Sequence, residues 1–261
     1  MSHQWDGLIG GALRAEEDPA APRLARFRPV GALPASAFCT LSNPQYQSSA
    51  SSCLAHAVEL VLASDVKART GAHIAVCRLD IYYGARVLAG DWPRDVGSYP
   101  HLAEQWLRER GTLPEILAPY DPSLVTTWKP KPEWAADRAA WTATLERLPA
   151  DVEQIKAEIA KDRGVVLCHN VDRQMVSEAG TTGAERGMTG PSLGGHARAV
   201  MGYDDARGAF LVVNSWKGWG IPHPADPAWR DSISWVPYGV MVNPAWSFDF
   251  RRLARGLPVE A

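Results

Sequence analysis

The spacing of apolar residues changes between the two halves of the chain. In the first half, residues 53–63 form a run of good helix formers, preceded by Ser51 and Ser52 as possible N-caps. Residues 79–88 and 100–111 continue the helical pattern. The pattern therefore predicts a helical first half in which the run at 53–63 is a buried helix.

Beyond residue 125 the apolar pattern changes its period. Residues 149–160 fit one amphipathic helix, because Val152, Ile155 and Ile159 fall on one face. Short apolar runs typical of strands follow at 165–167, 197–203, 210–214 and 233–236. Six glycines lie between positions 180 and 195, so we expect a flexible loop there that forms a binding edge or a lid.

These patterns divide the chain into three parts. Residues 1–34 are rich in Ala, Pro and Arg and show little periodicity, and we expect them to form an N-terminal arm laid over the rest of the chain. Residues 35–125 form the helical part and residues 126–261 the sheet-rich part, with the boundary placed where prolines become dense. The predicted fold class is α+β.

Composition and charge exclude several classes of protein. With 261 residues, 46% of them hydrophobic, the chain can build a real core, which excludes a fibrous or wholly disordered protein. The net charge of -2, without a block of five like charges, gives no sign of nucleic-acid binding. No apolar run approaches the roughly 18 residues of a membrane helix, and the N-terminus does not look like a signal peptide. We expect a cytoplasmic protein or one carried in a viral particle.

The four cysteines favour a reducing compartment. They are widely spaced and form no C-x-x-C pair, the pattern of zinc sites and redox motifs: Cys39, Cys53, Cys77 and Cys168. We therefore expect neither a disulfide scaffold nor a metal or organic cofactor.

Cys53 is the candidate nucleophile. It stands at the predicted start of a helix, where the helix dipole and unpaired amides stabilise a thiolate. His196 lies 143 residues later as a base, and Asn214 follows 18 residues after it as an acceptor that orients the imidazole. Acyl transfer also needs donors for the oxyanion, which Gln47 and the Cys53 N–H provide. Each residue alone has an ordinary packing interpretation, whereas the combination favours catalysis.

At these residues the chain resembles the papain-like cysteine peptidases, above all their prokaryotic and viral members without a long pro-domain. The resemblance is carried by QSSASSCLA at 47–55, GGHARAVMGY at 194–203 and NSWKGWG at 214–220. Shorter matches are IYYGAR at 81–86, GSYP at 97–100, GTLPE at 111–115 and WVPY at 235–238. The three long blocks occur in the family's order, and the matches extend over roughly residues 33–240.

The resemblance implies a two-lobed fold, with a helical lobe, a β-barrel-like lobe and the active site in the cleft between them. It makes Cys53 the nucleophile, His196 the base and then the acid, Asn214 the residue that orients His196, Gln47 the oxyanion donor and Trp216 a shield of the Asn–His hydrogen bond. Gly97 and Ser98 match the edge that pairs with the substrate backbone, and Gly195 is a further candidate substrate-binding residue. The implied ligand is an extended peptide or protein.

The chain also departs from the family at several positions. In the family's usual Cys-Gly-Ser-Cys-Trp motif, Ala50 replaces the first cysteine and Leu54 replaces the tryptophan. Without that first cysteine the family's neighbouring disulfide cannot form. Arg198 replaces an apolar residue, Ser98 replaces a glycine and narrows the edge, and Lys217 alters the loop after Trp216. About 30 residues precede the resembling part, which is too short for the family's long inhibitory pro-segment, and we expect no folded pro-domain. None of these departures removes a catalytic group.

The leading hypothesis is a thiol endopeptidase that acts through an acyl-enzyme on Cys53. Two alternatives stay open. One keeps the acyl-enzyme and changes the acceptor or donor, as in an acyltransferase or amidase. The other is a structural component of a larger assembly, docked through the N-terminal arm. The remaining acidic candidates, Asp91, Asp95 and Glu115, are expected to be surface or turn carboxylates.

Overall fold

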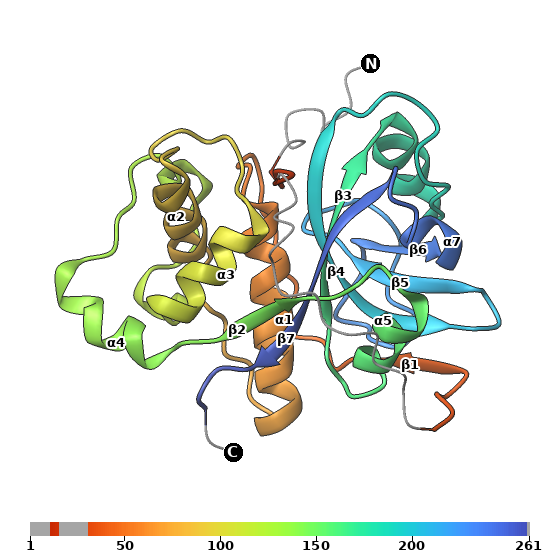
Figure 1. Ribbon diagram of the computed structural model, residues 1–261, viewed down its shortest axis with the longest axis horizontal. Coiled ribbons are helices and arrows are strands. Elements are labelled where there is room, and N and C mark those ends of the chain that lie inside the picture. The colour runs from red at the N-terminus through yellow and green to blue at the C-terminus, as the bar shows by residue number, and fades with distance from the viewer. Residues whose placement is uncertain (1–10, 16–30, 260–261) are drawn as a thin grey trace.

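A helical part and a sheet-rich part lie side by side, with one long helix between them (Figure 1). The structure is a computed structural model and describes residues 11–15 and 31–259. The long helix is α1 (Cys53–Thr70), and the mixture of helices with an antiparallel sheet confirms the predicted α+β class.

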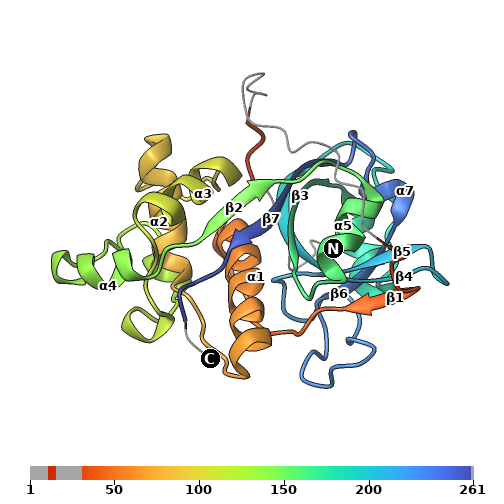
Figure 2. The same cartoon turned by 60° about the horizontal axis from the view of Figure 1, so that its bottom comes forward.

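The helical part follows α1 along the chain. It consists of α2 (Arg78–Ala89), α3 (Pro100–Glu109), η1 (Glu115–Leu117), η2 (Pro122–Leu124), η3 (Pro132–Trp134) and α4 (Ala135–Ala140). Figure 2 shows α4 on the far side of this part from the sheet. Among the described residues, the first strand after these helices is β2 (Thr144–Arg147), and the division of the chain at residue 125 stays a prediction.

Helix α1 begins at the predicted residue and extends past the predicted end. It stops at Gly71, whose φ of 73° lies in the left-handed region, and the Gly71 N–H donates to the Lys67 carbonyl. Ser52 occupies the N-cap position but makes no side-chain capping bond, so the predicted cap is only half right. The Ser52 hydroxyl instead lies 2.7 Å from the hydroxyl of Tyr120.

The sheet-rich part is built on one antiparallel sheet. Its other strands are β1 (Ser36–Phe38), β3 (Val165–Val171), β4 (Gly194–Asp204), β5 (Ala209–Val213), β6 (Ile233–Pro237) and β7 (Ser247–Arg255). The strand order is β2-β7-β3-β4-β5-β6, with β1 paired to β4. The sheet stays open within the described residues, so the barrel-like lobe is a curved sheet and not a closed barrel.

Four further short helices accompany the sheet. They are α5 (Val152–Ile159), the π-helix η4 (Met175–Ala179), α6 (Gly180–Thr182) and α7 (Tyr238–Met241). Helix α6 lies at the start of segment 180–195, for which the sequence predicts a flexible loop, and η4 ends directly before it. Two of its glycines serve close packing and a tight turn, because a Cβ on Gly180 would lie 2.7 Å from the Trp219 ring and Gly183 has a φ of 67°.

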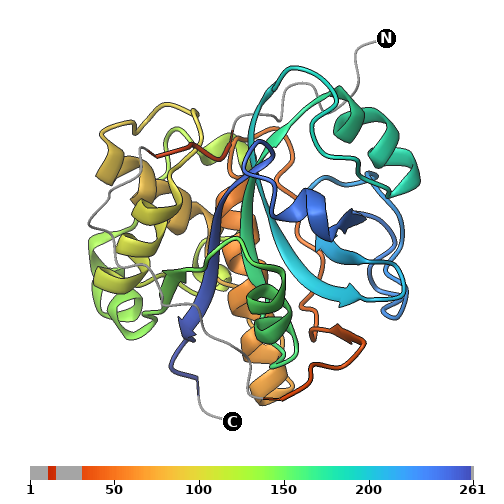
Figure 3. The same ribbon diagram turned by 45° about the vertical axis from the view of Figure 1, so that its right-hand side comes forward.

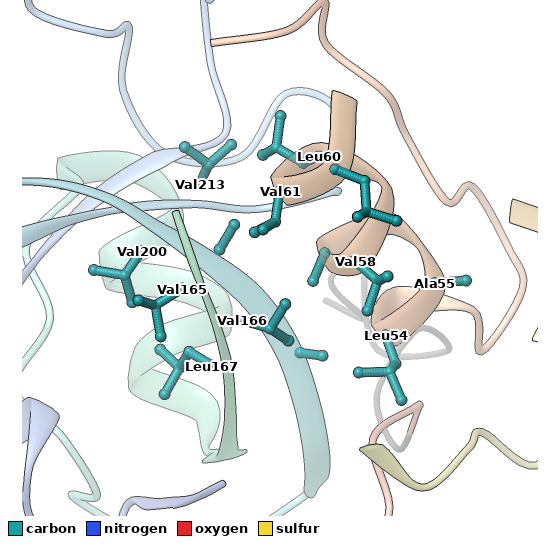
Figure 4. Packing of buried hydrophobic residues seen from close by; sticks show 14 of the residues in the cluster. Leu54, Ala55, Val58, Leu60, Val61, Val165, Val166, Leu167, Val200 and Val213 are labelled. Atoms are coloured by element: carbon teal, nitrogen blue, oxygen red, sulfur yellow. The ribbon is translucent and has the colours of Figure 1, made fainter. Parts of the chain in front are cut away.

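The hydrophobic core joins α1 to the sheet. Figure 4 shows Leu54, Val58 and Val61 on the helix facing Val166 on β3, while Val165 and Val200 lie on the opposite face of β3 and β4, and all of these residues are buried. Burying an aliphatic side chain of this size contributes about 1.5–3 kcal/mol. This packing fixes the start of α1 against the middle of β4, which places Cys53 beside His196.

Candidate active site

Cys53 is the first residue of α1, and its side chain is fully buried. Its Sγ accepts a hydrogen bond from the main-chain N–H of Ala197 at 3.3 Å. Ala197 directly follows His196 on β4. The fold therefore brings together two predicted catalytic residues that are far apart in the sequence.

Two neighbours fix the His196 imidazole. Its Nε2 lies 2.7 Å from Asn214 Oδ1, and the Trp216 ring covers the imidazole with 4.3 Å between the centroids. Asn214 Oδ1 also accepts from the Ser215 N–H at 2.8 Å, which is consistent with an oxygen at this position. His196 Nε2 then carries the proton and donates to Asn214. The other nitrogen, Nδ1, is buried without a hydrogen-bond partner among the described residues and is free to accept a proton.

Gln47 is buried next to the nucleophile loop. Its Oε1 accepts from the Ser215 hydroxyl at 2.6 Å, and its Nε2 donates to the Ala50 carbonyl at 2.8 Å. The Gln47 carbonyl also accepts from the Tyr120 hydroxyl at 2.8 Å. A primary amide has two N–H groups, so one is committed to this loop and the second is the group that an oxyanion would use.

Burial determines the protonation of Cys53 and His196. It raises the pKa of the Cys53 thiol to about 12; main-chain N–H groups oppose the rise and the charge of Asp95 adds to it. Burial lowers the pKa of His196 to about 3, against the hydrogen bond to Asn214 and with the help of the Arg198 charge. At neutral pH both groups are uncharged. Desolvation therefore outweighs the helix dipole that was expected to favour a thiolate.

Part of the N-terminal arm lies beside this pair. In Figure 3 the short red segment 11–15 crosses above the start of α1. The Ser98 N–H donates to the Gly11 carbonyl at 2.9 Å, and the Leu13 N–H donates to the Ser98 carbonyl at 2.9 Å. The Ala12 N–H donates to the Gly195 carbonyl at 3.4 Å. Ser98 and Gly195 thus pair with an extended segment of their own chain, and the bridge of Ala12 with Ser98 is parallel.

Glycines permit this close approach. A Cβ on Gly11 would lie 2.5 Å from Cys53 Sγ and 2.7 Å from the Ser51 carbonyl oxygen. A Cβ on Gly195 would lie 2.0 Å from the Ala12 carbonyl oxygen. No hydrogen bond joins Gly97 to the described segment 11–15. The φ of Gly97 is 88°, and its N–H donates to the Tyr82 hydroxyl at 3.0 Å.

Comparison with solved structures identifies the fold. Xylellain, a cysteine protease from Xylella fastidiosa, superposes with a TM-score of 0.80 at 22% identity over 97% of both chains. A procathepsin B of Trypanosoma congolense gives 0.72 at 18% identity over 98% of this chain and 88% of the other. A digestive procathepsin L 3 from the larval midgut of Tenebrio molitor gives 0.71 at 13% identity over 97% and 82%. The fold is papain-like. No protein-family profile and no curated protein sequence matches the chain.

Arg198 adds a buried ion pair to this papain-like fold. Its guanidinium donates to both carboxylate oxygens of Glu185, at 2.5 and 2.9 Å, and both side chains are at most 1% exposed. Its Nε donates to His169 Nε2 at 2.8 Å, and the His169 ring meets the His196 ring edge to face at 5.8 Å. The substitution noted in the sequence is therefore compensated by an acidic partner.

Two residues near Cys53 and His196 were not assigned to the site from the sequence, namely Asp95 and Phe248. Asp95, expected to be a turn or surface carboxylate, accepts from the Ser51 N–H at 3.1 Å and from the Tyr82 hydroxyl. Phe248 lies under the guanidinium of Arg14 from the arm, at 5.8 Å. These contacts join residues far apart in sequence and belong to no local motif. Asp91 agrees with the expectation of a surface or turn carboxylate, because it pairs with Arg94 three residues later.

The described residues contain neither a membrane-spanning helix nor a metal-binding cluster. None of the helices in this part of the chain is long and apolar enough to cross a membrane. No group of three or more His, Cys, Asp or Glu side chains among residues 11–15 and 31–259 is arranged to hold a metal ion.

Proposed function

We propose that this chain is a cysteine peptidase that hydrolyses peptide bonds through an acyl-enzyme on Cys53. The observation that carries the proposal is the placement of Cys53 beside the His196–Asn214 pair, at a position where main-chain groups of Ser98 and Gly195 bind an extended backbone. The papain-like fold supports the same conclusion. The expected substrate is an extended peptide within a longer chain.

The proposed reaction uses groups already described. His196 Nδ1 takes the proton from Cys53 Sγ, and the thiolate attacks the carbonyl carbon of the scissile bond. The Cys53 N–H and the second N–H of Gln47 Nε2 stabilise the oxyanion. The imidazolium gives its proton to the leaving amine as the C–N bond breaks. Water, deprotonated by His196, then attacks the thioester, and collapse of that intermediate returns the thiol and releases the carboxylate product.

In this proposal the described arm segment holds the enzyme in a latent state. Ser98 uses both its N–H and its carbonyl on the arm, so a peptide cannot pair with Ser98 until the arm leaves. Gly11 also lies against the thiol, where the attacked carbonyl has to enter. The peptidase is therefore expected to act only when segment 11–15 is displaced.

Covalent labelling tests the proposal on the full chain. Wild type, Gly11→Val, His196→Ala and Cys53→Ala are treated with an epoxide inhibitor of papain-like peptidases and analysed by intact mass and peptide mapping. We expect one adduct on Cys53, faster in Gly11→Val, absent in Cys53→Ala and strongly slowed in His196→Ala. Cleavage of a peptide library, with and without an added amine, then separates hydrolysis from acyl transfer. No adduct on folded Gly11→Val would overturn the proposal.

A further inference from the structure

The carboxylate of Asp95 lies between the two loops that form the site. One loop carries Ser51, two residues before the nucleophile, and its N–H donates to both carboxylate oxygens of Asp95 at 3.1 and 3.2 Å. The other loop contains Asp95 itself and continues to Ser98, which pairs with the extended arm. A single side chain therefore joins the backbone at the thiol to the backbone that binds the peptide.

A buried tyrosine completes this connection. The Tyr82 hydroxyl donates to Asp95 Oδ1 and accepts from the Gly97 N–H at 3.0 Å. Tyr82 belongs to α2 and is fully buried, and the Arg86 guanidinium lies over its ring at 3.8 Å. Arg86 also donates to the Arg94 carbonyl at 2.7 Å, so the same helix holds the loop just before Asp95. Helix α2 therefore holds the chain directly before Asp95, through Arg86, and directly after it, through Tyr82.

Hydrogen bonds are the connection between these loops. The four cysteines are free, so no disulfide joins the nucleophile loop to the loop of Ser98. We propose that Asp95 is a positioning residue that fixes the distance between the Ser98 edge and the backbone carrying Cys53, and so sets the affinity of the site for an extended peptide. The part of this proposal that concerns a peptide substrate rests on the proposed peptidase function. The positioning of Ser98 can be tested without it, because segment 11–15 is itself an extended ligand.

Two substitutions distinguish the contribution of the hydrogen bonds of Asp95 from that of its negative charge. Oδ1 accepts from both Ser51 and Tyr82, so an asparagine can keep the two bonds through one carbonyl oxygen. Asp95→Asn therefore retains the connection and Asp95→Ala removes it. Asp91→Ala is the matched control, because Asp91 lies in the same loop and pairs with Arg94 at the surface without touching Ser51 or Tyr82.

Two measurements on the full chain test the proposal. The first is amide hydrogen exchange of variants made in the wild-type chain, which requires no enzymatic activity. We expect the amides of Gly97 and Ser98 to exchange about 10-fold faster in Asp95→Ala than in wild type. In Asp95→Asn and Asp91→Ala their exchange rates should stay within about twofold of wild type. In the Gly11→Val background, Asp95→Ala is expected to raise KM for an extended peptide about 10-fold with kcat changed less than threefold, and Asp95→Asn to restore KM.

The outcomes decide between the possibilities. Unchanged exchange at Ser98 in a folded Asp95→Ala overturns the proposal, and so does an equal effect of Asp95→Asn and Asp95→Ala. A loss of kcat without a change in KM also overturns it. If Gly11→Val cleaves no peptide, the proposed function fails, and the exchange experiment still judges Asp95. Thermal unfolding of each variant identifies any that is globally unfolded. If Asp95→Ala is unfolded, Tyr82→Phe takes its place, because it removes the hydroxyl that joins Asp95 to the Gly97 N–H. Faster exchange at Gly97 and Ser98 in Tyr82→Phe is then expected, and unchanged exchange overturns the proposal.

Discussion

Replacing Gly11 by valine is expected to expel the arm from the active site. A Cβ at this position would lie 2.5 Å from Cys53 Sγ and 2.7 Å from the Ser51 carbonyl oxygen, well inside van der Waals contact. Segment 11–15 then loses its three hydrogen bonds to Ser98 and Gly195. At about 1 kcal/mol each, this weakens docking by about 3 kcal/mol, which corresponds to about a 100-fold larger open fraction.

Iodoacetamide labelling of Cys53 measures that fraction directly. The thiol is fully buried, so it reacts through the open state, and the rate follows the open population while opening and closing stay fast. We expect Gly11→Val to label Cys53 about 100-fold faster than wild type and to cleave extended peptides more rapidly. Gly190→Val is the control, because nothing lies within 4 Å of a Cβ at that position and the arm is untouched.

An unchanged labelling rate in Gly11→Val would refute this reasoning, since it would mean that the arm does not limit access to the thiol. Two of the other buried cysteines provide an internal check, because the thiols of Cys39 and Cys77 donate to the carbonyls of Ile159 and Ala118 and take no part in the arm contacts described above. Faster labelling of these two together with Cys53 would indicate global destabilisation and would equally contradict local release of the arm.

Three further predictions concern buried charge and the oxyanion. Burial raises the pKa of Glu59 to about 8, above an unfolded value of roughly 4.3, so its contribution to stability is complete below about pH 4 and is lost as the pH rises through 8. Between pH 5 and 8 the free energy of unfolding of wild type should therefore fall by up to about 1.4 kcal/mol per pH unit, as measured by urea unfolding. Glu59→Gln should not show this fall. Arg198→Met should lower the free energy of unfolding by about 3–5 kcal/mol, whereas the double variant with Glu185→Leu should recover most of it; an equal loss in both would contradict a buried ion pair. Gln47→Ala in the Gly11→Val background should lower kcat about 100-fold with little change in Cys53 labelling, and an unaltered kcat would exclude Gln47 as an oxyanion donor.

Periodicity predicts most of the elements that build the core, although not β7, whose Phe250 and Leu253 are buried in it. The run at 53–63 lies within α1, and the four apolar runs of the second half overlap β3, β4, β5 and β6. These segments are apolar on the face that packs, so burial and local preference agree. The pattern does not indicate the short strands β1 and β2, because β1 spans only three residues and Leu145 is the one apolar residue of β2. Both strands pair with distant parts of the chain.

The contacts around the candidate site depend on partners that no local pattern reveals. Arg198 looked like an unfavourable substitution until Glu185 was found beside it, supplied by a segment whose glycines suggested a flexible loop. Asp95 has the sequence context of a turn, and its bond to Ser51 exists only because α2 brings the two loops together. Segment 11–15 belongs to a part of the chain with little periodicity, and the position of this segment is set by main-chain hydrogen bonds, which any sequence can make.

The arm affects the chemistry of the site as well as access to it. Cys53 and His196 are both fully buried, and burial is the main cause of the high thiol pKa and of the low imidazole pKa. Gly11 lies directly on the thiol, so displacing it lets water reach Sγ and removes part of that desolvation. The two pKa values then move toward each other, in the direction that favours proton transfer from Cys53 to His196. In the proposed peptidase, displacement of segment 11–15 therefore both opens the edge at Ser98 to a peptide and activates Cys53, which couples substrate access to reactivity without a second switch.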